Sequence, residues 1–169
     1  MSKMPEETRL AVVNSTPWIS LSIIDKLHLL PRLYQTVVVP QAVYKEILAG
    51  GEGNPGYGEI QEAKWLRVEK ISDERANAFL LLELDEGESE TIILAEELKA
   101  DVVILDERLA RRIAELRGLR ITGTLGVLLK AKKLGYIKKV KPLLDVLIRN
   151  GVWIGKDLYR IILEEAKEA

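Results

Sequence analysis

Residues 88–106, with the sequence ESETIILAEELKADVVILD, constrain the fold more than any other part of the chain. An apolar stretch with helical spacing leads into the β-branched run VVIL, which is typical of a buried parallel strand. Glu88 and Glu90 open this unit and Asp106 ends it. Because functional side chains gather at the carboxyl ends of strands in open α/β sheets, the unit predicts a fold class and a candidate site together.

The rest of the chain repeats this alternation of short strands and helices. Pro17, after a Thr16 N-cap, marks a helix start, and Gly50 marks a helix end. Alternating elements of this kind predict a parallel sheet covered by helices on both faces. The other strands are expected at 9–13, 37–39, 65–71 and 120–122, and the other helices at 17–26, 27–33, 40–50, 73–84, 107–116, 125–134, 142–148 and 157–167, with a flexible loop at 50–58.

Composition narrows the class of protein. The length of 169 residues is that of one domain. The 25 basic and 26 acidic residues nearly cancel, so the protein as a whole has no strong electrostatic field that would attract nucleic acid or a membrane surface. The absence of cysteine excludes disulfides and thiolate sites. With no signal peptide or long apolar span, we expect a cytoplasmic protein without a membrane partner. Four Asn and three Gln beside 30% charged residues favour a thermophilic source.

Acidic and amide side chains are expected to meet at one edge of the sheet. Asn14 and Asp106 each follow a buried strand, and right-handed crossovers bring such strand ends together. Glu46 lies on a helix among small neighbours, and Glu90 lies in the first turn of its helix. Carboxylates that converge without His or Cys repel one another unless a hard cation such as Mg²⁺ or Mn²⁺ neutralises them. Such a site suits phosphodiester hydrolysis.

Each of these residues also has a structural explanation, which for any one of them alone is the commoner case. Asp106 suits the N-cap of the next helix, and Glu88 and Glu90 suit a helix N-terminus. Asn14 can cap a turn, and Glu46 can belong to a solvated helix face. These alternatives stay open at the level of sequence.

Other motifs exclude competing functions. His28 is the only histidine in the sequence, which excludes a Ser-His-Asp mechanism. A lone histidine of this kind is expected to be packed or exposed. Gly51, Gly53 and Gly56 match G-x-G-x-x-G, but they follow a helix instead of a strand, so we reject a nucleotide site. The three tryptophans are expected in the core.

A basic stretch could contact a phosphate backbone. Residues 130–141 hold six lysines with Tyr136 among them, although a solvated helix end explains this pattern about as well. A second group of cations follows Asp106 on the next helix. The candidate RNA-contacting residues are Arg108, Arg111, Arg112, Lys130, Lys132 and Lys133.

Four blocks in this order and spacing resemble the PIN-domain family, specifically its toxin-like branch related to VapC proteins. They are VVNSTPWISLSII, VVVPQAVYKEIL, LDEGESETIILAEE and VVILDERLARRIAELRGLRITGTLGVLLKAK. The resemblance implies a three-layer α/β/α sandwich with a mainly parallel five-stranded sheet and RNA cleavage that depends on Mg²⁺ or Mn²⁺. We expect a single domain over 1–169, with a core at about 9–150 and a C-terminal helical extension at 151–169.

The resemblance also assigns roles to residues. The family's first acid falls on Asn14, the second on Glu46, the third on Glu90 with Glu88 as a rival, and the fourth on Asp106. Because Glu88 and Glu90 stand two apart, only one of them is expected to face the site. Asn14 departs from the family pattern, since its amide oxygen is uncharged and cannot act as a base.

Three hypotheses follow. The first is a metal-dependent ribonuclease that acts as the toxin of a toxin–antitoxin pair. In this hypothesis Glu46, Glu90 and Asp106 hold the metal. Glu88 is a further ligand, and Asn14 orients water or phosphate. The second is a PIN-fold module that has lost catalysis and binds RNA or protein. The third, a doubly wound small-molecule binder, lacks a glycine signature. The resemblance further predicts a small antitoxin partner and a homodimer formed by the helices after Gly123.

Overall fold

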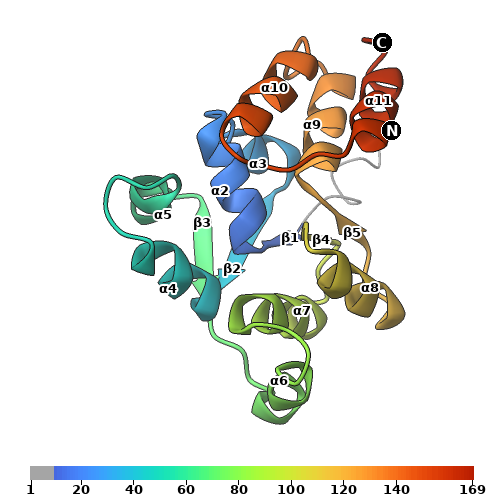
Figure 1. Ribbon diagram of the computed structural model, residues 1–169. Helices are drawn as coiled ribbons and strands as arrows, with labels where there is room; N and C mark the ends of the chain where they lie inside the picture. Colours follow the sequence, from blue (N-terminus) through green and yellow to red (C-terminus); the bar gives the residue numbers. More distant parts are fainter. Residues whose placement is uncertain (1–9) are drawn as a thin grey trace, which may run out of the picture.

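A five-stranded, all-parallel sheet forms the middle layer of the protein, with helices on both faces (Figure 1). The computed structural model describes residues 10–169. The strands are β1 Leu10–Val13, β2 Thr36–Pro40, β3 Leu66–Glu69, β4 Val102–Ile104 and β5 Ile121–Thr122, in the spatial order β3-β2-β1-β4-β5. The predicted α/β/α sandwich with a five-stranded parallel sheet is confirmed. Arg9, the expected start of the first strand, lies outside the described residues.

The helices divide between the two faces of the sheet according to the pleat of the strands. Val12, Val38 and Val103 point to one face, which is covered by α6 Glu74–Leu80, α7 Glu86–Leu98 and α8 Arg108–Leu116. The intervening strand residues face the larger core on the other side. That core is covered by α2 Ser15–Ile23, α3 Leu29–Leu33, α4 Gln41–Ala49, α5 Tyr57–Glu62, α9 Thr124–Lys133, α10 Lys141–Arg149 and α11 Lys156–Glu165.

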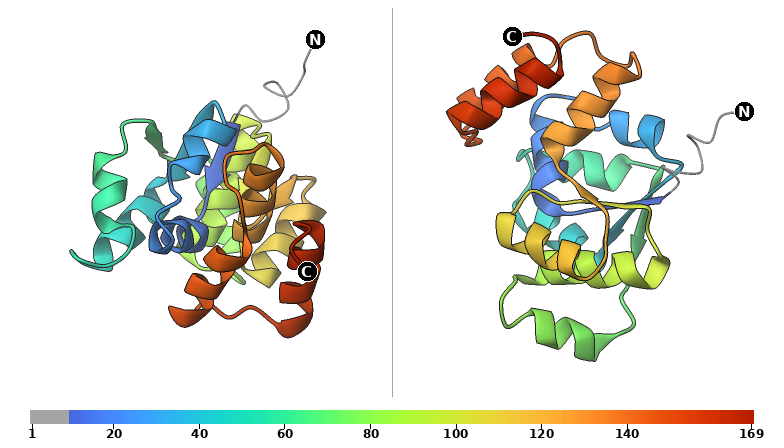
Figure 2. Two further views of the ribbon diagram at one scale, coloured as in Figure 1. Left: turned by 90° about the horizontal axis from the view of Figure 1, so that it is seen from above. Right: turned by 90° about the vertical axis from the view of Figure 1, so that its right-hand side faces the viewer.

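The last helices extend the larger core beyond the sheet. Figure 2 shows α10 and α11 stacked beside α9 at one end of the molecule. Leu144 and Leu147 of α10, and Ile162 and Leu163 of α11, are buried in that core. Within residues 10–169, no helix is long and apolar enough to cross a membrane.

Three local expectations are wrong. Helix α2 begins at Ser15 instead of Pro17, directly after β1. The expected loop at 50–58 runs into an unpredicted helix, α5, which is held by the buried Ile60 and by a bond of 3.1 Å from Trp18 Nε1 to the Gly56 carbonyl. Trp18 is buried as expected, but Trp153 is 87% exposed, so not all tryptophans belong to the core.

The central pair of strands sets the position of the candidate site. Val13 of β1 pairs with Ile104 of β4, and the Asn14 N–H donates to the Ile104 carbonyl at 3.0 Å. Asn14 and Asp106 therefore lie at the same carboxyl edge of the sheet, as the βα alternation predicted. The starts of α2, α4 and α7 converge at this edge (Figure 1).

Candidate functional site

Asn14 lies at the centre of the carboxyl edge and is almost completely buried, with 2% of its surface exposed. It occupies the N-cap position of α2, but its side chain makes no capping bond. Its Oδ1 lies 3.3 Å from the hydroxyl of Thr91, which also donates to the Gly87 carbonyl at 2.6 Å. The amide thus faces α7, so the expectation that Asn14 serves as a simple turn cap is wrong.

Glu46 reaches the same point from α4. Its Oε2 accepts a hydrogen bond of 3.0 Å from the Ser15 hydroxyl, next to Asn14 in the chain. A methyl group on Gly87 would lie only 2.6 Å from Glu46 Oε1 and 3.4 Å from Asn14 Oδ1. A residue without a side chain is therefore required at position 87 for Glu46 and Asn14 to approach α7 this closely. Glu46 as a whole is exposed, as a solvated helix face predicts, and its carboxylate contacts the site through the Ser15 hydroxyl.

Glu88 and Glu90 project from opposite sides of α7, as the spacing of two residues predicted. Glu88 forms a capping box with Asp85: its side chain accepts from the Asp85 N–H at 3.2 Å, and Asp85 Oδ1 accepts from the Glu88 N–H at 2.8 Å. Glu90 Oε1 instead accepts from the Ala42 N–H at 3.1 Å. The expected role of Glu88 at a helix N-terminus is confirmed, and Glu90 contacts the N-terminus of a different helix, α4.

Asp106 is held by the first turn of α9. Its Oδ1 accepts from the Thr124 N–H at 2.8 Å and its Oδ2 from the Thr124 hydroxyl at 2.6 Å. The N-cap of α8 is Glu107, so the expectation that Asp106 caps the following helix is wrong. A methyl group on Gly123 would lie 2.6 Å from Asp106 Oδ1 and 2.9 Å from an Arg111 nitrogen. Glycine at position 123 therefore leaves room for the carboxylate.

Negative charge accumulates between α4, α7 and α8. Burial raises the pKa of the Glu46 carboxyl above its usual range, Asp85 raises it further, and the Ser15 bond acts in the opposite direction. Burial likewise raises the pKa of Glu88, and the charges of Asp85, Glu107 and Glu46 add to that rise against the backbone bond from Asp85. A cation near these groups would relieve both the repulsion and the cost of burial.

The donor set fits a hard divalent cation in chemistry but not in its present arrangement. The oxygens of Asn14, Glu46, Glu88 and Asp106 are the ligands that Mg²⁺ and Mn²⁺ prefer. In the part of the chain that the structure describes, however, no three acidic side chains are gathered closely enough to hold one ion. The shared cation site of Glu46, Glu90 and Asp106 stays a prediction. Ser15, Ala42 and Thr124 each engage one of these carboxylates.

Of the predicted RNA-contacting cations, the arginines lie nearer the site than the lysines. Arg111 Nη1 donates to the Leu105 carbonyl at 2.7 Å, beside Asp106. Arg108 and Arg112 are exposed on the same helix.

The three lysines lie toward the far end of α9 from Thr124. Lys130, six residues beyond Thr124 and so about 9 Å along the helix axis, stacks over Tyr34. Lys132 pairs with Glu168 at 2.8 Å, and Lys133 is exposed. The structure does not bring these lysines together with the acidic residues of the candidate site.

Several residues at the site were not predicted from sequence. Ser15 and Thr124 each follow a candidate ligand or strand end and hold a carboxylate. Asp85 and Glu107 contribute charge. A signal for Asp85 was present, because Asp three residues before Glu88 is a capping-box pattern. No sequence pattern indicates that Thr124 contacts a residue 18 positions earlier.

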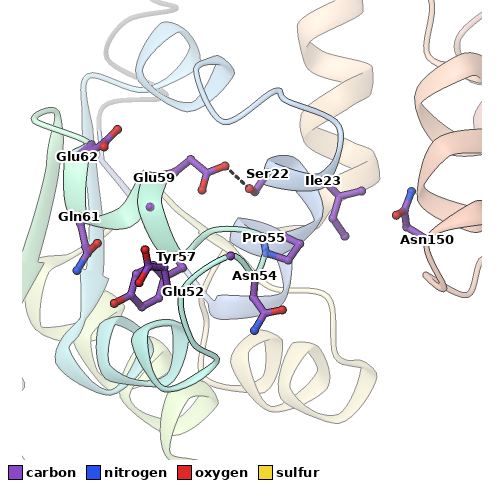
Figure 3. A pocket seen from close by; sticks show the side chains of 12 residues that line it. Ser22, Ile23, Glu52, Asn54, Pro55, Tyr57, Glu59, Gln61, Glu62 and Asn150 are labelled. Carbon is purple, nitrogen blue, oxygen red and sulfur yellow. Dashed lines mark hydrogen bonds between the residues drawn. The ribbon is translucent and has the colours of Figure 1, made fainter.

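A separate pocket lies on the α2–α5 side of the molecule (Figure 3). It has a volume of about 610 Å³ and contains Glu52, Glu59 and Glu62, with the Ser22 hydroxyl donating to Glu59 at 2.5 Å. None of the predicted site residues lines it. A smaller hollow of about 400 Å³, bordered by Glu46, Asp85 and Gly87, adjoins the candidate site instead. We therefore place the site by its chemistry at the sheet edge.

The parallel α/β/α sandwich, with oxygen donors at the carboxyl edge of its central strands, defines the class of fold. Residues 10–168 match a protein-family model described as a PIN domain, so the chain belongs to the PIN-domain family. PIN domains generally depend on divalent metals, and membership suggests RNA as a substrate. The comparison with curated proteins gave no match.

Proposed function

We propose that the protein is a metal-dependent endoribonuclease that hydrolyses RNA phosphodiesters with Mg²⁺ or Mn²⁺. The observation that carries the proposal is the set of oxygen donors, Asn14, Glu46, Glu88 and Asp106, directed to one sheet edge without His or Cys. Their mutual repulsion supports a cation there.

Each residue contributes a distinct function. Glu46, Glu88 and Asp106 would hold the metal, directly or through water, and when bound it would supply a water of lowered pKa for in-line attack on phosphorus. Asn14, which is uncharged, orients that water or the scissile phosphate through its amide. Thr124 keeps both oxygens of Asp106 in place. Arg108, Arg111 and Arg112 of α8 neutralise phosphates of the RNA.

The cleavage of a labelled single-stranded RNA tests the proposal. We expect cleavage with Mg²⁺ or Mn²⁺, none with EDTA, and weakening as salt is added, because phosphate contacts are salt-dependent. Asp106→Asn keeps an acceptor for Thr124 but removes a charge, and should reduce the rate by about a hundredfold or more. The matched control is Glu115→Gln at an exposed position on α8. Cleavage that survives EDTA or Asp106→Asn would contradict the proposal.

A second function is favoured by one residue. Asn14 stands where the family resemblance places an acid, so the metal has one fewer charged ligand, and the protein could act as a non-catalytic RNA-binding or protein-interaction module. Asn14→Asp separates the two functions. If the site is catalytic, the added carboxylate should raise Mn²⁺ affinity by about tenfold and speed cleavage. If wild type and Asn14→Asp both bind RNA and leave it intact, the non-catalytic function is correct.

The proposed partners are those that the resemblance to the toxin-like branch of the family implies. We propose that the protein is the toxin of a toxin–antitoxin pair, acts in the cytoplasm and forms a homodimer. Support comes from exposed apolar side chains on the last two helices and on the segment between them. They are Ile148, Trp153, Leu158 and Ile161.

A further inference from the structure

Helix α4 begins without a cap of its own. Its N-cap residue is Pro40, whose side chain has no acceptor, and its first turn contains no acidic residue. The first N–H groups of any helix lack partners within the helix, and a negative charge near them is stabilising. The Ala42 N–H finds its acceptor on another helix, because Glu90 of α7 accepts from it at 3.1 Å.

The geometry of α7 separates the two acids near its start. Gly87 and Thr91, one turn apart, face Asn14. Residues two apart on a helix differ in direction by about 200°, so Glu88 and Glu90 lie on opposite flanks of that face. Glu88 is on the flank that carries the capping box with Asp85. Glu90 is on the flank that meets the start of α4.

We propose that Glu90 is the cap of α4 and acts as a positioning residue for Glu46 instead of as a metal ligand. This inference rests on the proposed function. Glu46 lies one turn after Ala42, so a carboxylate that ties the first turn of α4 to α7 also fixes where Glu46 meets Gly87 and Ser15. Glu90 therefore accepts from the start of a different helix, whereas Glu88 accepts within the capping box of its own helix.

Two side chains at position 90 distinguish a cap from a ligand. Glu90→Gln keeps an oxygen that accepts from Ala42 but loses the charge, whereas Glu90→Ala loses both. Hydrogen exchange at the Ala42 amide reports the cap directly, and electron paramagnetic resonance of added Mn²⁺ reports the metal. Glu88→Gln is the comparison variant. The Lys141 amide, which donates to Glu168, is an internal control within the same exchange experiment.

For a cap, Glu90→Ala should raise Ala42 exchange by about fivefold or more and leave Lys141 unchanged. It should also weaken Mn²⁺ binding by about threefold to tenfold, and Glu90→Gln should restore most of both properties. Glu88→Gln should weaken Mn²⁺ binding by about tenfold or more without changing Ala42 exchange.

The inference is overturned if Glu90→Gln weakens Mn²⁺ binding as much as Glu88→Gln does, or if Glu90→Ala leaves Ala42 exchange unchanged. Should wild type not bind Mn²⁺ at all, the proposed function fails. The exchange measurement, with rescue by Gln, still decides whether Glu90 caps α4.

Discussion

Single residues decide how the acids approach one another. Asn14 is buried, and a neutral amide costs less to bury than a carboxylate would beside Glu46. Gly87 and Gly123 have no side chain, and each therefore leaves room for one carboxylate oxygen. Ser15 and Thr124 then fix these carboxylates by hydrogen bonds. The site is therefore built as much by small residues as by acids.

Gly87→Ala should separate function from stability. Alanine is favoured over glycine in a helix by about 1 kcal/mol, so the melting temperature should hold or rise. The new methyl, 2.6 Å from Glu46 Oε1, should displace that carboxylate and weaken Mn²⁺ binding by about tenfold. Calorimetry with and without Mn²⁺ measures both effects.

Gly58→Ala is the matched control, because a methyl there has open space within another helix, α5. It should change stability by a similar favourable amount and leave Mn²⁺ binding unaltered. Equal Mn²⁺ affinity in Gly87→Ala and wild type would show that Glu46 does not depend on the space at position 87.

At the scale of elements, carboxylates repeatedly cap a helix that is distant from them in sequence. Asp106 caps α9, Glu90 caps α4, and Glu168 accepts from the Val140 and Lys141 N–H groups at the start of α10. Glu168 also pairs with Lys132 of α9. These contacts tie together helices that are far apart in sequence, so local helix signals do not reveal them.

The Glu168 contact predicts a pH dependence. Burial by itself would raise the pKa of Glu168, but the bonds from Lys132, Val140 and Lys141 outweigh it and lower the pKa from 4.5 to about 2. Since the folded pKa is the lower one, the stabilisation is fully present above pH 4.5 and is lost as the pH falls towards 2. The protection factor of the Lys141 amide, which is the exchange rate of an unstructured peptide divided by that of this amide at the same pH, should fall by roughly tenfold over this range.

Glu168→Gln should show the lower protection factor at neutral pH already, and its protection factor should not change as the pH falls from 4.5 to about 2. The control is Glu165→Gln, at an exposed position on α11. A Lys141 amide whose exchange responds to pH equally in wild type and Glu168→Gln would contradict this role of Glu168.

At the scale of the whole molecule, the last helices combine a packed face with an exposed one. Leu163 and Leu147 are buried in the larger core, whereas Ile161 of α11 and Trp153, between α10 and α11, are exposed. Light scattering should report the proposed homodimer, and Trp153→Ser with Ile161→Ser should shift it to monomer. Leu82→Ser changes another exposed apolar side chain, after α6, and should leave the dimer intact. A wild-type monomer over a wide concentration range would contradict the dimer.

The sequence by itself determined the order of the strands along the chain, the parallel sheet and the edge at which Asn14 and Asp106 meet. These follow from hydrophobic period, proline and glycine positions and the handedness of βα crossovers, which are local or general properties. The blocks of sequence also predicted the PIN-domain family, which the family match confirms.

Only the tertiary structure decided the partners of each carboxylate. Thr124, Ser15 and Ala42 donate to Asp106, Glu46 and Glu90, which lie 18, 31 and 48 positions away, and helical periodicity contains no information at such separations. The same limit explains why helix α5 and the exposure of Trp153 were missed, because burial depends on which distant segments pack nearby. A periodic pattern shows which way a side chain points from its own element, and packing alone determines what it meets there.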